Sequence, residues 1–459
     1  MTTLDPGTAP TLDPQRLSAE FDTVIVAAPD TQGRLFGRRL GVDGFVRAAA
    51  DGGVNVSTCV YGWDIQQDST LLANGGLPYT SMQSGMGDFR LEPDLGTLRT
   101  AGWLERTAVC LARSVEEDGS PTEVSPRTIL AKELDRWAEL GLSASTGTEL
   151  EFFLYRGSPR AARRADYRDL EPTTLSPADY SLYEGDEFEP FFADLRERFE
   201  RTGLRLEASQ VEWGLGQWET TLQHGEPLDM ADRHALYKLA TRSLAARNDM
   251  TATFMAKPFD GGPGSSCHVH VSIRDAAGNP YFWDPSSEAA ADGLRWAVGG
   301  ILAHAPAVMA FYAPTVNSYR RTRGTDAAGW GRTWGIDHRF TTVRVIGHTP
   351  DAIRLEFRQP GADANPYLVL AATLASVRLG LADRIDPGLP VSGSPFDQGV
   401  TEFPQTLGEA VRSLRDSEVA REVLGDFVVD HYATLLAQDW AFFLDSVTDW
   451  ERRRYFELI

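Results

Sequence analysis

Two short segments carry pairs of metal-ligating side chains two positions apart. Glu149 and Glu151 lie in the segment TELEFFL, and His268 and His270 lie in SSCHVHVS. Side chains two residues apart on a β-strand point to the same face of the sheet, so each pair should project together. Two neighbouring carboxylates in an apolar strand repel each other unless water or cations reach them. For each segment alone, an open polar face and a metal-binding face are both consistent with the pattern.

A third segment holds two further carboxylates around a pair of glycines. Glu212 and Glu219 are seven residues apart in QVEWGLGQWE, a spacing that would put them on opposite faces of one regular strand. Gly214 and Gly216 lie between them, and glycine permits the bulges and bends that re-aim a strand. We therefore expect the chain to bend here so that both carboxylates point inward.

A fourth segment, RLEFR, alternates charged and apolar residues. Arg354, Glu356 and Arg358 share one of its faces, and a surface ladder of ion pairs or the wall of a functional site would both explain them. Guanidinium groups can also grip carboxylate or phosphate oxygens in a planar, bidentate manner. Further arginines of the same half of the chain are Arg321, Arg339 and Arg344.

If these strands line one cleft, the cleft contains five carboxylates and at least one imidazole. Oxygen-rich ligand sets select Mg²⁺ or Mn²⁺, and two or three such ions would nearly cancel the negative charge. Metal ions beside arginines are the arrangement used for phosphoryl transfer. The sequence has no GxxxxGK[ST] loop and only three lysines, which excludes a P-loop enzyme.

The composition restricts the class of partner. The chain has 459 residues and a formal net charge of −21, which argues against nucleic acid and anionic membranes, because both require a basic surface. Three cysteines are too few for a disulfide scaffold. The N-terminus lacks the basic and apolar regions of a signal peptide, and no apolar run is long enough to span a bilayer. We expect a cytoplasmic protein.

The hydrophobic pattern predicts an α+β protein in which a disordered lead-in at 1–15 precedes two domains, 18–118 and 125–459. A linker is expected at about 115–125, followed by a helix that Ser125 caps and Pro126 begins. The expected strands are at 21–29, 143–155, 205–222, 265–273 and 340–358. The expected helices are near 188–202, 228–249, 288–311, 364–381 and 405–455.

From about residue 20 to 459, the ordered segments together resemble the glutamine synthetase family. The matching segments are TELEFF, VEWGLGQWE, ATFMAKPFDGGPGSSCHVHVS, NSYRR, HRFTTVR and RLEFRQPGADANPYL. The resemblance implies a small N-terminal β-grasp domain and a larger α+β catalytic domain. It also implies a dodecamer of two stacked hexameric rings, with active sites between neighbouring subunits. The implied reaction is ATP-dependent phosphorylation of the γ-carboxylate of glutamate, followed by attack of an amine on the acyl phosphate.

The resemblance also implies a role for each matching residue. The implied metal ligands are Glu151, Glu212 and Glu219 at a first site, and Glu149, His268 and Glu356 at a second. The residues implied to contact ATP are His270, Ser272, Arg344 and Arg354. Those implied to hold glutamate or the transferred phosphate are Gly264, Arg321, Arg339 and Arg358, of which Arg321 and Arg339 are also the expected catalytic groups.

The sequence departs from the family where glutamine-forming members bind and deprotonate ammonium. The segment CVYGWDIQQDS lacks their ammonium-binding aspartate or displaces it to Asp64, and Asp326 is the only carboxylate in the expected closing loop, 320–331. A pocket with fewer carboxylates binds and deprotonates ammonium less well, so we expect an organic amine. Ethanolamine or a short alkylamine is the first choice, a polyamine the second and ammonia the third. Aromatic and apolar residues suited to such an amine are Tyr61, Trp63, Val60, Trp213 and Trp330.

Two other classes of function remain as alternatives. A binuclear metal hydrolase would also use carboxylates and a pair of histidines, but it has little use for many arginines. A non-catalytic family member would keep the architecture as a scaffold. A complete set of metal ligands argues against the scaffold, because an unused cluster of carboxylates destabilises a fold.

Overall fold

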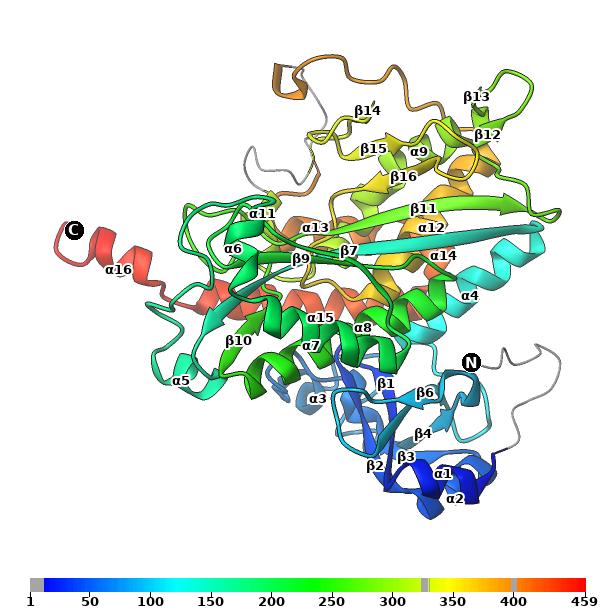
Figure 1. The fold of residues 1–459 in the computed structure, drawn as a ribbon, viewed down its shortest axis with the longest axis vertical. Coiled ribbons are helices and arrows are strands. Elements are labelled where there is room, and N and C mark those ends of the chain that lie inside the picture. The colour runs from blue at the N-terminus through cyan, green and yellow to red at the C-terminus, as the bar shows by residue number, and fades with distance from the viewer. Residues whose placement is uncertain (1–11, 323–328, 330, 398–402) are drawn as a thin grey trace.

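The computed structural model describes residues 12–322, 329, 331–397 and 403–459, and Figure 1 shows its two units. Helix α1 (Pro14–Glu20) begins inside the segment predicted as a lead-in, because the Asp13 side chain accepts the backbone N–H groups of Gln15 and Arg16 and caps the helix. Residues 1–11 lie outside the described part of the chain. The expected α+β class is confirmed.

The N-terminal unit is built on a sheet of six strands in the order β2-β1-β6-β4-β3, with β5 paired to β6. The strand expected at 21–29 is β1, which pairs antiparallel with β2 to form a hairpin and also pairs parallel with β6. Its strands are β1 (Thr23–Pro29), β2 (Leu35–Gly41), β3 (Val54–Ser57), β4 (Asp88–Pro93), β5 (Arg99–Thr100) and β6 (Thr107–Val115). Its other helices are α2 (Val42–Ala50), η1 (Thr58–Tyr61), α3 (Thr70–Asn74) and η2 (Leu95–Thr97).

The turn between β1 and β2 touches the catalytic unit. Gly33 has a φ of +79°, and a Cβ there would lie 3.0 Å from the Asn365 backbone, so glycine serves both the turn and the close approach. The Asn365 amide donates to the carbonyl oxygens of Asp30 and Thr31, and its Oδ1 accepts the N–H of Tyr367 in the first turn of α12. One side chain therefore caps a helix and contacts the neighbouring unit.

The second unit, which corresponds to the expected catalytic domain at 125–459 and is called the catalytic unit below, contains a sheet of eight strands. Their order is β14-β15-β16-β11-β7-β9-β8, with β10 paired to β7. The segments expected as single strands at 205–222 and 340–358 each form two strands joined by a turn. The strands of the sheet are β7 (Leu142–Arg156), β8 (Leu206–Val211), β9 (Gln217–Leu222), β10 (Met250–Thr253), β11 (Cys267–Asp275), β14 (Trp334–Ile336), β15 (Val343–Ile346) and β16 (Arg354–Phe357). A separate small hairpin consists of β12 (Trp283–Asp284) and β13 (Ala289–Ala290).

One face of this sheet is apolar and covered by helices, which leaves the other face for polar side chains. Leu150, Phe152, Val269, Leu355 and Phe357 belong to the main core, and Figure 1 shows helices on the side of the sheet that faces the N-terminal unit. The long helices are α4 (Pro126–Glu139), α7 (Glu189–Thr202), α8 (Pro227–Arg247), α9 (Asp292–His304), α12 (Pro366–Asp383), α13 (Leu407–Asp416) and α15 (Asp426–Asp445). The shorter ones are α5 (Pro159–Arg164), α6 (Leu182–Asp186), η3 (Ala305–Val308), α10 (Met309–Tyr312), α11 (Ser318–Thr322), η4 (Pro395–Asp397), α14 (Glu418–Leu424) and α16 (Asp449–Tyr455).

Helix α4 begins at Pro126, as the sequence predicted, but Ser125 does not cap it with its side chain. The Ser125 side chain is buried and makes no cap hydrogen bond, while the Ser125 backbone carbonyl accepts the N–H of Ile129. The expected side-chain cap is therefore wrong, and the start of this helix depends on the fixed φ of proline.

Two helical segments are long and apolar enough to cross a bilayer by length and composition alone. They are Asp292–Tyr312 and Pro366–Asp383, and 72% of the apolar window of each is buried inside the molecule. That degree of burial is typical of helices that form a protein core.

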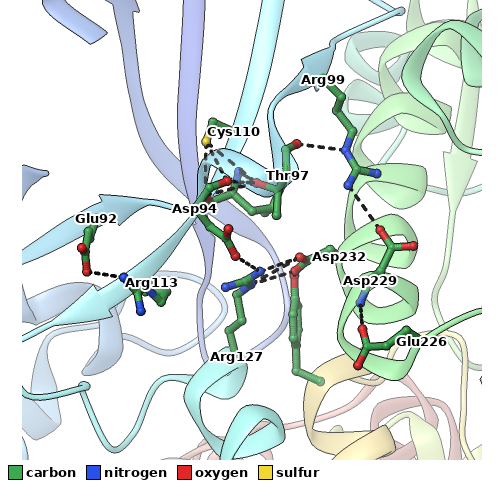
Figure 2. Close-up of polar contacts among 12 residues, drawn as sticks. Glu92, Asp94, Thr97, Arg99, Cys110, Arg113, Arg127, Glu226, Asp229 and Asp232 are labelled. Carbon is green, nitrogen blue, oxygen red and sulfur yellow. Dashed lines mark hydrogen bonds and ion pairs between the residues drawn. The ribbon is translucent and has the colours of Figure 1, made fainter. Parts of the chain in front are cut away.

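A network of ion pairs joins the two units (Figure 2). Arg127 of α4 donates to Asp94 of the N-terminal unit at 2.8 Å and to Asp232 of α8 at 2.9 Å. Arg99 of β5 donates to Asp229 of α8 at 3.2 Å. These ion pairs accompany apolar contacts at the junction, because Trp103, Val109 and Leu111 of the N-terminal unit belong to the main core.

Candidate active site

The register of the catalytic sheet places the predicted metal ligands on one face. Glu149 of β7 pairs with His268 of β11, and Glu151 of β7 pairs with Glu219 of β9. On the other side of β11, His270 pairs with Glu356 of β16. Directly paired residues of antiparallel strands project from the same face, so four strands contribute to one polar surface.

The first group on this surface consists of Glu149, His268, His270 and Glu356. His268 Nδ1 lies 3.1 Å from Glu149 Oε2 and 3.4 Å from Glu356 Oε1, and His270 Nε2 lies 2.8 Å from Glu149 Oε1. Ligand atoms of Glu149, His270 and Glu356 lie within 4.8 Å of one another, close enough to hold one metal ion. Both histidines therefore contact the second predicted metal site, including the one that the resemblance placed on the ATP side.

Local charges keep two carboxylates of this group ionised. Burial opposes ionisation of Glu149, but contacts from the two imidazoles outweigh it and hold its pKa well below the usual value. Burial likewise opposes ionisation of Glu356, and the charge of Arg358 lowers its pKa below the usual value. This group is ready to bind a cation without first losing carboxyl protons.

The second group consists of Glu151, Glu212 and Glu219. Glu151 accepts hydrogen bonds from the backbone N–H of Ser266 and from Gln217 Nε2, both at 2.9 Å. Gln210 Nε2 donates to Glu212 at 3.3 Å and to Glu219 at 3.4 Å. The three carboxylates thus share neutral donors and are not joined to arginine by the ion pairs of the described residues.

The pKa values of two carboxyl groups in this second group are raised by burial and by neighbouring negative charges. Burial, and then the charge of Glu151, raise the pKa of Glu212 to about 7. Burial, and then the charges of Glu149, Glu151 and Glu212, raise the pKa of Glu219 to about 9. Adjacent carboxylates without a cation disfavour ionisation in this way.

The bend expected between Glu212 and Glu219 is the turn of a hairpin. Glu212 N donates to Gln217 O, and Gln217 N donates to Gly214 O. Gly216 has a φ of +75°, and a Cβ on Gly214 would lie 2.6 Å from Gln217 Oε1, so neither position accepts a larger residue without strain. The turn brings the carboxylate at the end of β8 beside the one on β9.

The donor chemistry of the two groups fits divalent cations. Nε2 of His268 is buried and has no hydrogen-bond partner among the described residues, although buried polar atoms are nearly always paired. Carboxylate oxygens with a minority of imidazole nitrogens form a set for Mg²⁺ or Mn²⁺.

Arginines surround the first group. Arg344 donates to Glu356 at 3.0 Å and also to Asp337, Arg358 donates to Glu356, and Arg354 Nε donates to His270 Nδ1 at 3.2 Å. Arg339 is exposed in the segment between β14 and β15. These guanidinium groups can receive the negative charge of a phosphate or a carboxylate.

Gly264 and Arg321 pack directly against each other at the edge of the second group. A Cβ on Gly264 would lie 2.4 Å from Arg321 Cγ and 2.6 Å from the Ala256 carbonyl oxygen. The Gly264 carbonyl accepts a hydrogen bond from Gln217 Nε2 at 3.0 Å, and the same nitrogen donates to Glu151. Arg321 can therefore occupy its position only because residue 264 has no side chain.

The remaining predicted site residues lie in several different parts of the structure. Tyr61 is fully buried in the core of the N-terminal unit, and its hydroxyl bonds to Ser114 at 2.7 Å, so its ring presents no exposed surface to an amine. Trp63 is half-buried against a small cluster formed by Leu72 and Leu77 of the N-terminal unit and Leu435 of α15. Ser272 is half-buried on β11 and pairs with Ser145. Asp326, Trp330 and most of the expected closing loop lie outside the described residues.

Sequence reasoning missed the neutral residues that orient the acids, and one further acid. Gln217 lay inside a recognised segment, but an amide between two carboxylates gives no periodic signal. Ser266 supplies both a backbone and a hydroxyl donor to Glu151. Asp179 lies in an irregular segment before α6, where alternation offers no guidance. An isolated acid preceding a tyrosine in SPADYS was the only available signal.

Comparisons with known proteins assign this chain to a family. Residues 123–455 match the family described as glutamine synthetase, catalytic domain. The chain is also 34% identical over 443 residues to the glutamate–isopropylamine ligase of a Pseudomonas species, covering 96% of both chains. The chain belongs to the glutamine synthetase family. The predicted membership and the predicted enzyme class, a carbon–nitrogen ligase, are confirmed.

Other members of the glutamine synthetase family are similarly close. The gamma-glutamylethanolamide synthetase of Streptomyces coelicolor is 35% identical over 440 residues, which cover 96% of this chain and 94% of that relative. Among solved structures, a GmaS/ADP complex superimposes with a TM-score of 0.83 at 26% identity, covering 96% of this chain and 99% of that one. Members of this family typically use ATP and a divalent metal ion.

Proposed function

We propose that the protein is an ATP-dependent ligase that joins the γ-carboxylate of glutamate to a small organic amine through γ-glutamyl phosphate. The observation that supports this proposal is the placement of two acidic groups on one sheet face, bordered by Arg344, Arg358 and Arg339. Carboxylates for cations beside arginines for anions are the requirement of phosphoryl transfer to an acidic substrate.

The two half-reactions follow from the chemistry of a carboxylate. Its oxygen attacks the γ-phosphorus of ATP and ADP leaves, which replaces a poor leaving group with phosphate. The amine nitrogen then attacks the carbonyl carbon, phosphate leaves, and the nitrogen loses a proton. The arginines around Glu356 would bind the oxygens on which negative charge develops. The bound cations supply Lewis-acid polarisation of the phosphate oxygens.

The metal sites follow the two groups of the polar face. We propose that each active site holds two to three Mg²⁺ or Mn²⁺ ions. Glu151, Glu212 and Glu219 would hold one ion, and Glu149, His268 and Glu356 would hold another. His270 would turn toward the nucleotide because Arg354 already occupies its Nδ1. Gly264, Arg321 and Arg358 would hold glutamate or the transferred phosphate, and Ser272 would lie on the nucleotide side.

The proposed amine is ethanolamine or a short alkylamine, with polyamines second and ammonia third. Two relatives are named for isopropylamine and ethanolamide, and a third, of an Acinetobacter species, is named gamma-glutamylanilide synthase. The exposed ring of Trp213, directly after Glu212, offers an apolar surface that ammonium does not need.

The proposed assembly is a cytoplasmic dodecamer of two hexameric rings. Support comes from apolar side chains at the C-terminal end that a monomer leaves in water. Phe456 is 83% exposed, Leu458 79% and Ile459 98%, and such a patch is unusual on a protein that stays single. Light scattering coupled to size-exclusion chromatography gives the mass of the assembly.

One assay tests the proposed function. Phosphate release is measured with ATP, glutamate and Mg²⁺ against ammonia, methylamine, ethanolamine, isopropylamine, putrescine and spermine, and the γ-glutamylamide is identified by mass spectrometry. We expect glutamate-dependent turnover with at least one small organic amine. Ammonia exceeding every organic amine would make the protein a glutamine synthetase. Ester hydrolysis without glutamate would favour a metal hydrolase, and nucleotide binding without turnover would favour a scaffold.

A further inference from the structure

The turn that leads into helix α11 is closed by two hydroxyl side chains. Thr315 N donates to Ser318 Oγ, and Ser318 N donates to Thr315 Oγ1, both at 3.0 Å. Reciprocal hydrogen bonds of this kind fix the backbone at the start of a helix. Helix α11 has only five residues, so its direction depends on this turn. Arg321 lies on α11, and its position therefore depends on the two hydroxyls.

Asp363 holds both hydroxyls from a distant part of the chain. Its Oδ2 accepts hydrogen bonds from Thr315 Oγ1 at 2.9 Å and from Ser318 Oγ at 2.6 Å. Hydrogen bonds to an ionised acceptor are stronger than those between neutral groups. Asp363 lies 45 residues further along the chain than Ser318, between β16 and α12. One carboxylate oxygen therefore fastens the start of α11 to the segment that follows β16.

The backbone that carries Asp363 is itself fixed beside the site. Ala362 N donates to Ser265 O at 3.1 Å, and Lys238 Nζ donates to Ala362 O at 2.6 Å. Ser265 directly follows Gly264, the residue whose missing side chain leaves room for the arginine of α11. Asp363 is therefore held by the same part of the fold that borders the second acidic group.

The other carboxylate oxygen of Asp363 lies on the side of Arg321. The two groups meet around Gly361, where a Cβ would lie 2.4 Å from Asp363 Oδ1 and 3.6 Å from Arg321 Nε. Both atoms are buried, and neither has a hydrogen-bond partner among the described residues. The lack of a side chain at 361 gives the carboxylate room beside the guanidinium group.

The guanidinium group of Arg321 requires a negative counter-charge. Arg321 is 3% exposed. Burial lowers its pKa, while the charges of Glu151 and Asp363 raise it. The hydrogen bond that Arg321 Nη2 donates goes to the neutral carbonyl of Gln359. Because Glu151 is a proposed metal ligand, Asp363 is the acid that remains to balance Arg321.

We propose that Asp363 is a positioning residue for Arg321, which it holds through the turn before α11 and through its charge, so that the guanidinium group meets the glutamate substrate. The inference deepens the proposed function and rests on it. A carboxylate that acted only through its charge would repel the anionic substrate. A carboxylate that positions Arg321 strengthens glutamate binding instead, so the two effects have opposite signs.

The first test removes the charge of Asp363 in the full-length protein. Asp363→Asn keeps the size of the side chain and an acceptor for the two hydroxyls. We expect the KM for glutamate to rise roughly tenfold or more, the effect of losing a hydrogen bond to a charged group, while the KM for ATP stays near the wild-type value. Asp383→Asn, which removes an exposed acid at the end of α12, is the matched control.

A double-mutant cycle shows whether Asp363 acts through Arg321. The dissociation constant of glutamate is obtained from the rise in thermal midpoint that glutamate causes in the presence of Mg²⁺ and a non-hydrolysable ATP analogue, so inactive variants can be included. Arg321→Gln should weaken glutamate binding, and Asp363→Asn added to Arg321→Gln should weaken it no further. Ser318→Ala removes one hydroxyl and keeps both charges, so it should weaken binding by a smaller factor.

The outcomes separate the inference from the proposed function. Unchanged or tighter glutamate binding in Asp363→Asn, or losses that multiply in the double variant, would overturn the inference alone. If Asp363→Asn does not fold, unchanged binding in Ser318→Ala would overturn it. Unchanged binding in Arg321→Gln would remove Arg321 from the glutamate site. A wild-type protein that forms no γ-glutamylamide with any amine would overturn the proposed function and the inference with it.

Discussion

Arg127 and Asp232 form a buried ion pair in which Arg127 Nη2 and Nε both donate to the Asp232 carboxylate, at 2.9 and 3.1 Å (Figure 2). The side chains are 6% and 1% exposed. Tyr367 also donates to Asp232 at 2.7 Å. Because Arg127 simultaneously reaches Asp94, this pair connects the catalytic helices to the N-terminal unit.

Arg127→Ala should therefore destabilise the protein strongly. Removing one partner of a buried ion pair leaves an uncompensated charge, which costs about 3–5 kcal/mol. Thermal unfolding measures the effect as a lower midpoint. Arg113→Ala is the control, because the Arg113–Glu92 pair lies at the surface and contributes about 0–1 kcal/mol. Equal midpoints for the two variants would contradict the importance of the junction.

Glu151→Gln should weaken metal binding without unfolding the protein. Glutamine keeps the size of the side chain and removes its charge, and loss of a ligand or its orientation weakens metal affinity on the order of 10–100-fold. Mn²⁺ titration followed by calorimetry measures this loss, and chelation of the metal should abolish turnover in the wild type. Glu207→Gln, at an exposed position on β8 of the same sheet, should bind Mn²⁺ normally. Normal affinity in Glu151→Gln would remove this residue from the metal site.

Gly264→Ala should reduce activity by displacing Arg321. The added methyl group would overlap Arg321 Cγ and the Ala256 carbonyl oxygen, and overpacking of this kind costs about 1–3 kcal/mol. We expect a higher KM for glutamate and a turnover at least tenfold lower, on the order expected when a binding group moves by about an ångström. Gly262→Ala is the matched control in the same loop, since a methyl group there would meet no atom of the described residues within 4 Å. Similar kinetics in both variants would show that Arg321 does not depend on Gly264.

Acidification should destabilise the protein through His431. Nε2 of this fully buried residue donates to the Tyr61 carbonyl at 2.8 Å, and burial lowers the pKa of His431 to about 4. The unfolded chain binds a proton near pH 6.5, so the stability due to the neutral ring is present above that pH and is lost as the pH falls toward 4. The maximum loss is about 3 kcal/mol.

Urea unfolding at a series of pH values measures this dependence. His431→Gln keeps a donor and removes the titrating ring, so its free energy of unfolding should fall less between pH 6.5 and 4 than that of the wild type. Parallel pH profiles for the two proteins would show that His431 is not the titrating group.

The sequence predicted most of the site because strand periodicity is a local property. Alternation predicted that Glu149 and Glu151 share one face and that His268 and His270 share another, and the pairing of the strands places these residues and Glu356 on a common face. Their role as metal ligands came from the resemblance and stays a prediction. Alternation could not tell His268 from His270, since both point the same way. Only the structure distinguishes them, because Arg354 on the neighbouring strand β16 donates a hydrogen bond to His270.

The failures lie where the answer depends on distant parts of the chain. Tyr61 was selected as an aromatic residue in the segment that departs from the family, yet its ring is buried in the core of the N-terminal unit. Asp179 gave no periodic signal, because it lies in an irregular segment whose position depends on a hydrogen bond from Tyr180 to Val211. Ser125 has the right type and position for a cap, but its hydroxyl is buried away from the helix end.

The double role of Asn365 restricts how the molecule can open. Swinging the N-terminal unit away would break the amide contacts to Asp30 and Thr31 and disturb the cap of α12 at the same time. Hinge motion between the units is therefore coupled to fraying of a core helix, which is energetically unfavourable. Exchange of substrates and products with the two units held together would take place at the rim of the polar face.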